Sequence, residues 1–523
     1  MRPFQLLSVS LLAGILTVPL AGTADAGPKS CSKRSNNTPA KLLQCMTLEG
    51  VRAHQQALQD IADANGGIRT SGTPGYDASG DYVAQKLEDA GYNVTIQPFI
   101  YPFFEELSAA ELDQIAPVAT TYTYYGFPSG FATMTYSAAG DVTGAAEGVD
   151  IIDAAALPPN SSTSGCEATD FAGFTPGSIA IVQRGNCSFA LKALNAEGAG
   201  AVGVIIMNEG QPGREVNFLG TLGGTGITIP VVGASTDVGM ELAAGGVIVR
   251  IMVDAISEDR ETFNVLAETD AGDPGNVVMV GAHLDSVAEG PGIQDNGSGS
   301  SAILETALQM AKVNTRNRLR FAWWGAEEAG LVGSTYYVGN LSQEEGEVIA
   351  LYLNFDMIGS PNYFFGVYDG DDSDAVGSGP GPLGSAQIEA TFEQFYDALG
   401  EPHQGTDFSG RSDYGPFIAV GIPAGGLFTG AEGIKTPDEV LLYGGVSGEQ
   451  YDPCYHLACD TYDNVSETAL EINADAVAFS TLKYAMSTET INGVAGKGNF
   501  KERKLAMDAE MGKFEYLGNH LQQ

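Results

Sequence analysis

The chain has 523 residues, an ordinary apolar content of 44%, and 65 acidic against 25 basic side chains, which leaves a formal net charge of −40. This length is more than one average domain needs, so we expect two domains with well-formed cores. A surface with such an excess of acids repels nucleic acid and anionic membranes, which excludes both as expected partners and suits a soluble protein outside the cell.

The first 26 residues have the three parts of a secretory signal peptide. Arg2 supplies the positive charge, residues 6–20 are apolar, and residues 24–26 form a small-x-small cleavage site. A membrane anchor is the alternative, but two serines and a proline interrupt an apolar run that is shorter than a membrane span needs. We therefore expect residues 1–26 to be removed and the protein to be secreted, either extracellular or periplasmic.

The six cysteines fall into three near pairs along the chain. In an exported protein an even number of cysteines indicates disulfides, and local pairing is the simplest of the pairings that the sequence allows. A cysteine-ligated metal is less consistent with the sequence, because no two pairs share the short spacing of zinc-binding cysteines. The expected disulfides join Cys31 to Cys45, Cys166 to Cys187, and Cys454 to Cys459.

The residues after the signal peptide predict the start of an α/β domain. From residue 48 to residue 65 the apolar side chains recur at helical spacing and end at Asn-Gly-Gly, which is typical of a helix stop. A loop then leads to a second helix over about 78–90 and to a strand that begins near Tyr92. We assign residues 27–134 to the first part of this domain.

The character of the sequence changes over residues 135–256, which are rich in Gly, Ala, Val and Ile and poor in charge. Short apolar runs predict strands at 177–183, 201–207, 228–232 and 246–253. The segment GSIAIVQRGNCSFALKALNAEGAGAVGVIIMN resembles the protease-associated domain, a small β-rich module inserted into several exopeptidases and receptors. We interpret residues 135–256 as such an insert, which covers a site or controls the access of a substrate.

The α/β pattern resumes over residues 257–490. Apolar runs predict strands at 261–270, 277–280, 319–324 and 351–357, and helical periodicity predicts helices at 300–313, 385–399 and 466–486. Strands that alternate with helices indicate an open α/β sheet. Residues 491–523 are more basic, and we expect them to form a helical appendage or a flexible tail.

Five side chains that can bind a metal lie at strand ends or in loops. In an open α/β sheet the ligand site lies beyond the carboxyl ends of the strands. Two imidazoles and three carboxylates suit two Zn²⁺ ions, because one carboxylate can bridge both ions while each ion takes one histidine and one further acid. Such a pair lowers the pKa of a shared water. The candidate ligands are His283, Asp295, Glu328, Asp356 and His456.

Two more acids lie beside these candidate ligands. Glu327 precedes Glu328 in the turn after a strand, where one carboxylate can bind metal while the other takes a proton from an attacking water. Asp285 lies on the same strand face as His283 and could hold the second nitrogen of its imidazole. Each of these residues taken singly is more often a helix cap or a solvated charge, and only their combination indicates a metal site.

Seven motifs surround these residues: GAHLDSV, GIQDNGSGSSAILETA, LRFAWWGAEEAGLVGS, YLNFDMIGSP, GRSDYGPF, GGLFTGAE and DPCYHLACD. Together they resemble the secreted bacterial di-zinc leucyl aminopeptidases, from about Leu48 to Met486 with the insert between. The resemblance implies a zinc-exopeptidase fold, which is an α/β fold with a mixed, mostly parallel sheet sandwiched by helices. It also implies that this fold carries the small β-rich protease-associated domain as an insert.

The resemblance implies how the candidate ligands divide between the ions. It puts His283 and Asp356 on one zinc, Glu328 and His456 on the other, and Asp295 between them.

Three more roles follow from the same resemblance. Glu327 matches the general base, Tyr455 matches the group that stabilises the oxyanion, and Arg411 matches a position in the substrate pocket. The bond between Asp295 and Asn296 is expected to be cis. The Cys454–Cys459 disulfide would fix the loop that presents Tyr455.

The resemblance implies a monomeric aminopeptidase with two Zn²⁺ per chain that acts on the N-termini of peptides or proteins, preferring large apolar residues such as Leu. Some relatives also bind calcium, for which Glu471 and Asp475 remain, but Cys45 falls near a position where an acid would be needed. Three alternatives stay open at this point. They are a carboxypeptidase of the same fold, a catalytically silent receptor-like binding module, and a two-metal phosphoesterase.

Overall fold

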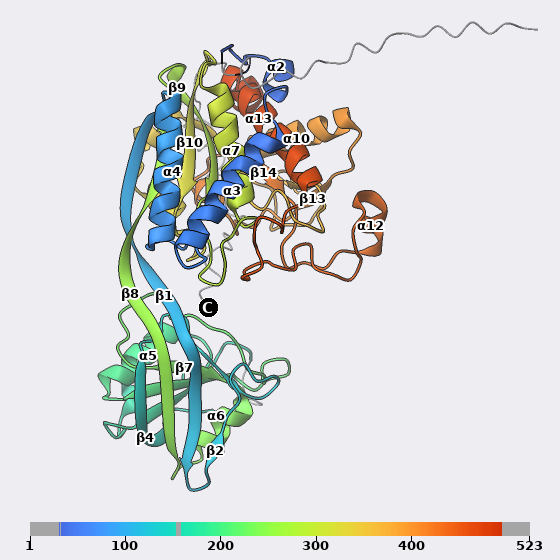
Figure 1. Ribbon diagram of the computed structural model, residues 1–523. Coiled ribbons are helices and arrows are strands. Elements are labelled where there is room, and N and C mark those ends of the chain that lie inside the picture. The colour runs from blue at the N-terminus through green and yellow to red at the C-terminus, as the bar shows by residue number, and fades with distance from the viewer. Residues whose placement is uncertain (1–30, 32, 153–157, 494–523) are drawn as a thin grey trace, which may run out of the picture.

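Two bodies make up the structure, a computed structural model that describes residue 31, residues 33–152 and residues 158–493. A long antiparallel ribbon, formed by β1 (Asn93–Ala116) and β8 (Ile248–Glu268), runs from the larger body into the smaller one (Figure 1). The predicted signal peptide and nearly all of the predicted tail lie outside the described residues. Within these residues no helix combines the length and the apolar character that a membrane crossing requires.

A mixed, mostly parallel sheet forms the centre of the larger body. Its strands lie in the order β13-β12-β14-β11-β9-β10-β8. Antiparallel pairing occurs between β12 and β14 and between β10 and β8, and the other neighbours in this order are parallel. The predicted fold class is therefore confirmed. The strands are β9 (Asp273–His283), β10 (Asn317–Trp324), β11 (Ile349–Phe355), β12 (Gly366–Tyr368), β13 (Gln404–Thr406) and β14 (Ala424–Phe428).

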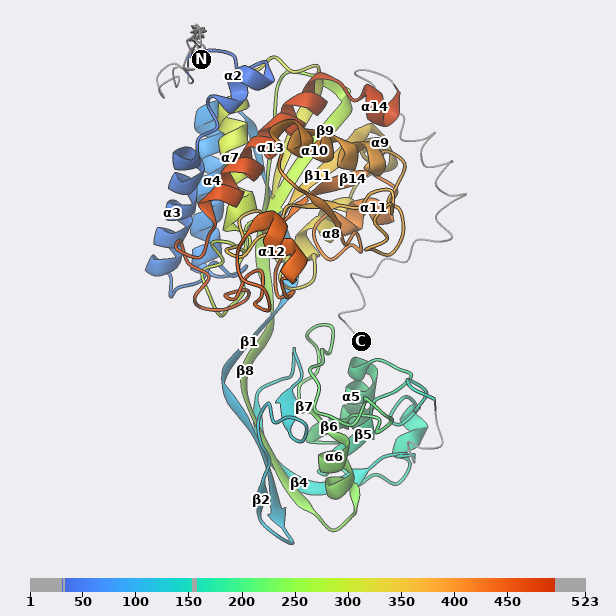
Figure 2. The same ribbon diagram turned by 90° about the vertical axis from the view of Figure 1, so that its right-hand side faces the viewer.

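Helices cover both faces of this sheet, as Figure 2 shows from the side. Trp323 and Trp324 are consecutive on β10 and belong to the apolar cores of opposite faces, because side chains alternate along a strand. The first face packs against α2 (Pro39–Leu43), α3 (Leu48–Ala64), α4 (Pro74–Ala90), α7 (Gly297–Met310), α10 (Ser385–Leu399), α13 (Glu467–Met486) and α14 (Glu489–Asn492). The second face packs against α8 (Val332–Gly339), α9 (Gln343–Val348) and α11 (Gly415–Ala419).

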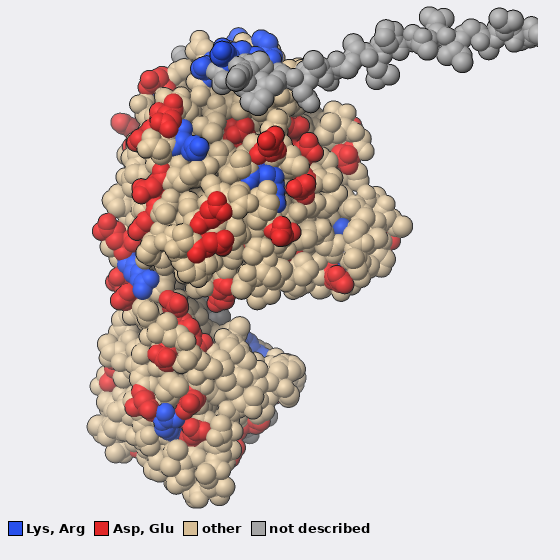
Figure 3. Space-filling model, viewed as in Figure 1, with Lys and Arg blue, Asp and Glu red and all other residues tan. Residues whose placement is uncertain are grey.

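The smaller body is a compact β-rich unit in which β4, β5, β6 and β7 run parallel and β3 pairs antiparallel with β7. Its visible surface carries few charged side chains in Figure 3, in keeping with a sequence that is poor in charge. Its elements are β2 (Thr120–Thr121), β3 (Phe131–Thr133), β4 (Gly140–Gly148), η2 (Ala168–Phe171), β5 (Ile179–Gln183), α5 (Phe189–Gly198), β6 (Gly203–Met207), β7 (Val231–Ala234) and α6 (Thr236–Ala243).

The chain passes from one body to the other within the β1–β8 ribbon. Leu112 of β1 and Ile251 of β8 are both fully buried in the core of the smaller body. Leu112 precedes residue 135, so the smaller body recruits part of β1 as well as the sequence of the insert. The limits of the insert at 135 and 256 stay a prediction. The chain enters and leaves the smaller body within two continuous strands, and no turn marks the point where one body ends and the other begins.

The predicted helices occur close to their expected ends, and the differences have local causes. The helix expected from about 78 begins at Pro74, where the fixed φ of proline and its missing N–H suit the first turn. The helix expected from 300 begins at Gly297, where the Asn296 side chain accepts a hydrogen bond from the N–H of Gly299. The three predicted disulfides are all formed.

Candidate metal centre

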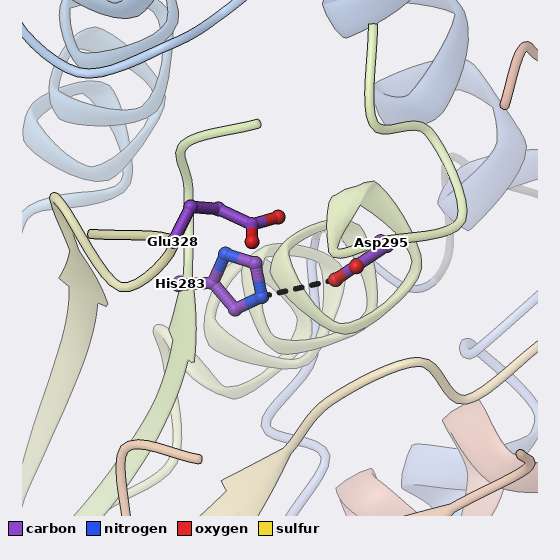
Figure 4. Close-up of side chains that lie close together, drawn as sticks. All are labelled: His283, Asp295 and Glu328. Atoms are coloured by element: carbon purple, nitrogen blue, oxygen red, sulfur yellow. Dashed lines mark ion pairs between the residues drawn. The ribbon is translucent and has the colours of Figure 1, made fainter. Parts of the chain in front are cut away.

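The predicted ligands converge at the carboxyl ends of the central parallel strands. His283 is the last residue of β9, Glu328 follows β10, and Asp356 follows β11. Asp295 lies just before α7, and His456 comes from the loop after α12 (Pro437–Tyr443). The parallel strands end at one edge of the sheet, so residues distant in sequence meet there. Figure 4 shows His283, Asp295 and Glu328 pointing toward one another.

The carboxylate of Asp295 joins two sets of ligands. Its Oδ1 lies 3.2 Å from Nε2 of His283, and its Oδ2 lies 3.2 Å from Nε2 of His456. The same nitrogen of His283 is 3.3 Å from Oδ1 of Asp356, and that of His456 is 3.0 Å from Oε2 of Glu328. The site therefore consists of two His–carboxylate pairs that share one bridging carboxylate.

These separations fit metal ions. Ligands that bind zinc at about 2.0–2.1 Å in tetrahedral geometry lie about 3.3 Å from one another, which is close to the observed distances. Oε1 of Glu328 and Oδ1 of Asp356 are also buried without a hydrogen-bond donor. A buried acceptor without a partner is costly unless a cation satisfies it. The residues present thus suit two zinc ions in donor type, in spacing and in unsatisfied oxygens.

Glu327 and Asp285 lie beside these ligands. The carboxylate of Asp285 accepts hydrogen bonds from the N–H groups of Glu327 and Glu328, at 3.2 and 3.4 Å. Its backbone oxygen lies 3.2 Å from Nδ1 of His283, whereas its carboxylate is 3.6 Å away. Asp285 thus holds both the imidazole and the turn that presents the two glutamates.

A cavity of about 120 Å³ opens onto these groups. Tyr455 and Glu327 line it, and the ring of Tyr455 stacks on His456 with the centroids 3.8 Å apart. Arg411 lies at its rim, with a side chain that is 54% exposed and an ion pair of 3.6 Å to Glu432. The apolar part of the wall consists of Met357, Tyr368, Tyr414, Phe428 and Ala431.

Two buried polar side chains that the sequence reasoning missed hold the loop of Asp295. Arg69 is fully buried and donates to the carbonyl oxygens of Leu284, Pro291 and Gly292. Asp460 accepts the N–H of Asp295 at 2.9 Å and also that of Gln294. Hydrogen bonds to the backbone leave no trace in a sequence pattern, so nothing marked Arg69, whereas Asp460 is the last residue of the motif DPCYHLACD. The bond between Asp295 and Asn296 is cis, as the resemblance implied.

Two more missed residues, Ser412 and Asp413, lie close to the candidate ligands. Ser412 donates to Oδ2 of Asp356 at 2.6 Å, and Asp413 is fully buried without a hydrogen-bond donor to either oxygen. Burial, chiefly, raises the pKa of Asp413 to about 8. Both residues lie in the motif GRSDYGPF, so the motif itself was the available signal.

Elsewhere in the described residues, Asp369, Asp371 and Glu389 form the other group that could hold a metal. Its carboxylates are already engaged, because Glu389 accepts two backbone N–H groups and Asp369 accepts two more. Glu471 and Asp475 belong to neither group, and calcium at these two residues stays a prediction.

Burial and the neighbouring charges favour protons on His456 and Glu328 and disfavour a proton on Asp295. Burial lowers the pKa of His456, but the carboxylates of Glu328 and Asp295 outweigh it and raise this pKa to about 11. Burial and the charge of Asp295 raise the pKa of Glu328 to about 7. The imidazoles of His283 and His456 hold the pKa of Asp295 below its usual range, against the effect of burial.

Zinc binding should therefore release protons. An imidazole binds a metal only in its neutral form, so His456 must lose a proton when the ion enters at pH 7, and the affinity should weaken as the pH falls. Titration calorimetry measures the heat of zinc binding to chelator-treated protein in two buffers of different ionisation enthalpy. The two heats should differ, because the buffer takes up the protons that zinc binding releases. Equal heats in both buffers would contradict the protonation described here.

Comparisons with known proteins agree with this geometry. Residues 264–481 match the model of peptidase family M28, and residues 152–242 match the PA domain. An aminopeptidase of Pseudomonas aeruginosa is 46% identical over 92% of this chain and 90% of its own length. Leucine aminopeptidase 2 of Trichophyton equinum is 49% identical over 62% of this chain and 65% of its own. The solved aminopeptidase of Aneurinibacillus sp. strain AM-1 aligns with a TM-score of 0.62 and 26% identity, over 88% of this chain and 98% of its own.

Proposed function

The chain belongs to peptidase family M28 and is a metallo-aminopeptidase, and we propose that it is a secreted enzyme with two zinc ions per chain. In this proposal it removes large apolar residues such as Leu from the N-termini of peptides. The two oxygens of Asp295, each facing a different imidazole, carry the proposal. The three disulfides support an oxidising compartment such as the cell exterior.

Each ion would take one imidazole and one further acid. His283 and Asp356 would hold the first, Glu328 and His456 the second, and Asp295 both. Zinc in such a pair supplies Lewis-acid chemistry, because it lowers the pKa of water and polarises a carbonyl oxygen.

Glu327 is the general base of this proposal. Burial, above all, raises the pKa of its carboxyl well above the usual value, and the carboxylates of Asp413 and Glu328 add to this. A base with a raised pKa can take a proton from the attacking water and later return it to the leaving amine. The backbone of Glu327 is fixed by Asp285, so its carboxylate keeps its place in the cavity.

Tyr455 would stabilise the negative charge that develops on the carbonyl oxygen. Burial, chiefly, raises the pKa of its phenol, and the nearby carboxylates of Asp295 and Glu328 raise it further. The hydroxyl therefore stays protonated and can donate a hydrogen bond to the oxyanion. The Cys454–Cys459 disulfide closes a short loop around this residue.

The cavity wall supports a free-amine substrate with a large apolar side chain. The carboxylates of Glu327 and Asp356 line it and can bind a protonated amine together with the backbone near Arg411. Met357, Tyr368 and Phe428 offer apolar surface to the side chain.

A carboxypeptidase would need basic groups for the terminal carboxylate of its substrate. Apart from the two histidines proposed as zinc ligands, Arg411 is the one basic residue in the lining, and it already pairs with Glu432. The complete set of five ligand residues speaks against a silent binding module.

The substrate class is tested with aminoacyl-p-nitroanilides and their N-acetylated counterparts. Leu-p-nitroanilide should be cleaved, its N-acetyl form should not, and a chelator should abolish the activity until zinc is added back. If zinc-loaded protein cleaves no substrate with a free amine, the proposed function is wrong.

Replacing Glu327 with Ala should lower kcat by about 10²–10⁴-fold, which is the usual contribution of a general base, and should leave the zinc content unchanged. Glu344→Gln, an exposed acid on α9, is the control and should behave like the wild type. Near-full activity of Glu327→Ala would remove Glu327 from its assigned role.

A further inference from the structure

A second cavity, of about 170 Å³, lies where the two bodies meet. The loop after β9, residues 285–289, and residues 101–104 of β1 form much of its wall. Thr135 and Tyr136 of the smaller body complete it. Glu328, a proposed zinc ligand, lines both this cavity and the cavity at the candidate metal centre. The two cavities therefore adjoin, with Glu328 between them. We name it the junction cavity.

The walls of the junction cavity are mainly apolar. Phe104 and Tyr136 meet edge to face with their ring centroids 6.0 Å apart. The hydroxyl of Tyr101 donates a hydrogen bond to the carbonyl oxygen of Ser71, so Tyr101 can contact a ligand in this cavity through its aromatic ring. Val287, Ala288 and Ala329, which are all half-buried, add aliphatic surface. An apolar side chain fits such a wall better than a charged one.

The aromatic wall is held in place by its surroundings. Tyr101 and Phe103 are almost fully buried, and the guanidinium of Arg260 lies 3.4 Å above the ring of Phe103. Phe104 packs against apolar cores of the smaller body. A preformed pocket costs a ligand little ordering, so apolar contacts made there raise affinity efficiently.

The proposed reaction indicates which part of the substrate the junction cavity would bind. An enzyme that removes a single N-terminal residue binds that residue on one side of the cleaved bond. The rest of the peptide must leave on the other side, past the metal ligands. The cavity at the metal centre has the apolar wall and the carboxylates for the first residue. The junction cavity adjoins it across Glu328 and carries no basic side chain in its wall.

We propose that the junction cavity is a substrate subsite, which takes an apolar side chain of the residue that follows the cleaved bond. The preferred substrates are then peptides with an apolar second residue. The smaller body contributes to this preference directly, through Tyr136 and Thr135. This inference rests on the proposed aminopeptidase function and adds a second point of recognition to it.

The test compares kcat/KM for two tripeptides, Leu-Leu-Gly and Leu-Gly-Gly, which differ only in the second side chain. The zinc-loaded wild type should prefer Leu-Leu-Gly by about tenfold or more, which is typical of an apolar side chain in a fitted pocket. Ala288→Phe fills the cavity without removing core contacts and should bring the ratio close to one. Phe104→Ala widens the cavity and should reduce the ratio as well.

Phe127→Ala is the matched control, because Phe127 also belongs to the smaller body but is 80% exposed and lines neither cavity. It should keep the wild-type ratio. If the wild type cleaves both peptides equally well, or if Ala288→Phe keeps the wild-type ratio, the subsite is refuted while the aminopeptidase function stands. If the wild type cleaves neither peptide, the proposed function fails and the subsite fails with it.

Discussion

The site depends on one carboxylate that faces two imidazoles at once. Asp295 can do so only if its backbone is fixed, because a shift of the loop by about 1 Å would bring one oxygen out of range of its partner. Arg69 holds the carbonyl side of this loop and Asp460 holds the amide side. Both side chains are buried, and their hydrogen bonds to the backbone offset part of the cost of desolvation.

The rest of the site is placed by the parallel strands. β9, β10 and β11 are neighbours in the sheet, and each delivers an acid or an imidazole at its carboxyl end. The Asp285 carboxylate then couples two of these strand ends, since it extends from the end of β9 to the backbone of the Glu327–Glu328 turn. This arrangement puts the proposed general base and a proposed metal ligand side by side on one short segment. The β1–β8 ribbon brings the smaller body against the same turn.

The sequence allowed much of this to be predicted, for identifiable reasons. The strands are apolar runs, and several candidate ligands lie where these runs end. The hydrophobic pattern of the sequence is therefore almost sufficient to predict the positions of His283 and Asp356 at the ends of strands. The loop that carries Tyr455 and His456 follows no strand. His456 was predicted as a ligand from its chemistry, and only the resemblance assigned Tyr455 to the site. Arg69 was missed because it bonds to backbone atoms, whereas Asp460 was missed although it ends the motif DPCYHLACD. The full length of β1 was missed because much of this strand is exposed.

The zinc content of the protein tests the central claim most directly. Mass spectrometry of metals in protein equilibrated with zinc and passed through zinc-free buffer should give about two zinc ions per chain, as expected for a shared-carboxylate site. Asp295→Ala should reduce this content below one, whereas Asp371→Ala, in the other acidic group, should leave it unchanged. A wild type that retains a single zinc, and keeps it when Asp295 is replaced by Ala, would contradict a centre built on Asp295.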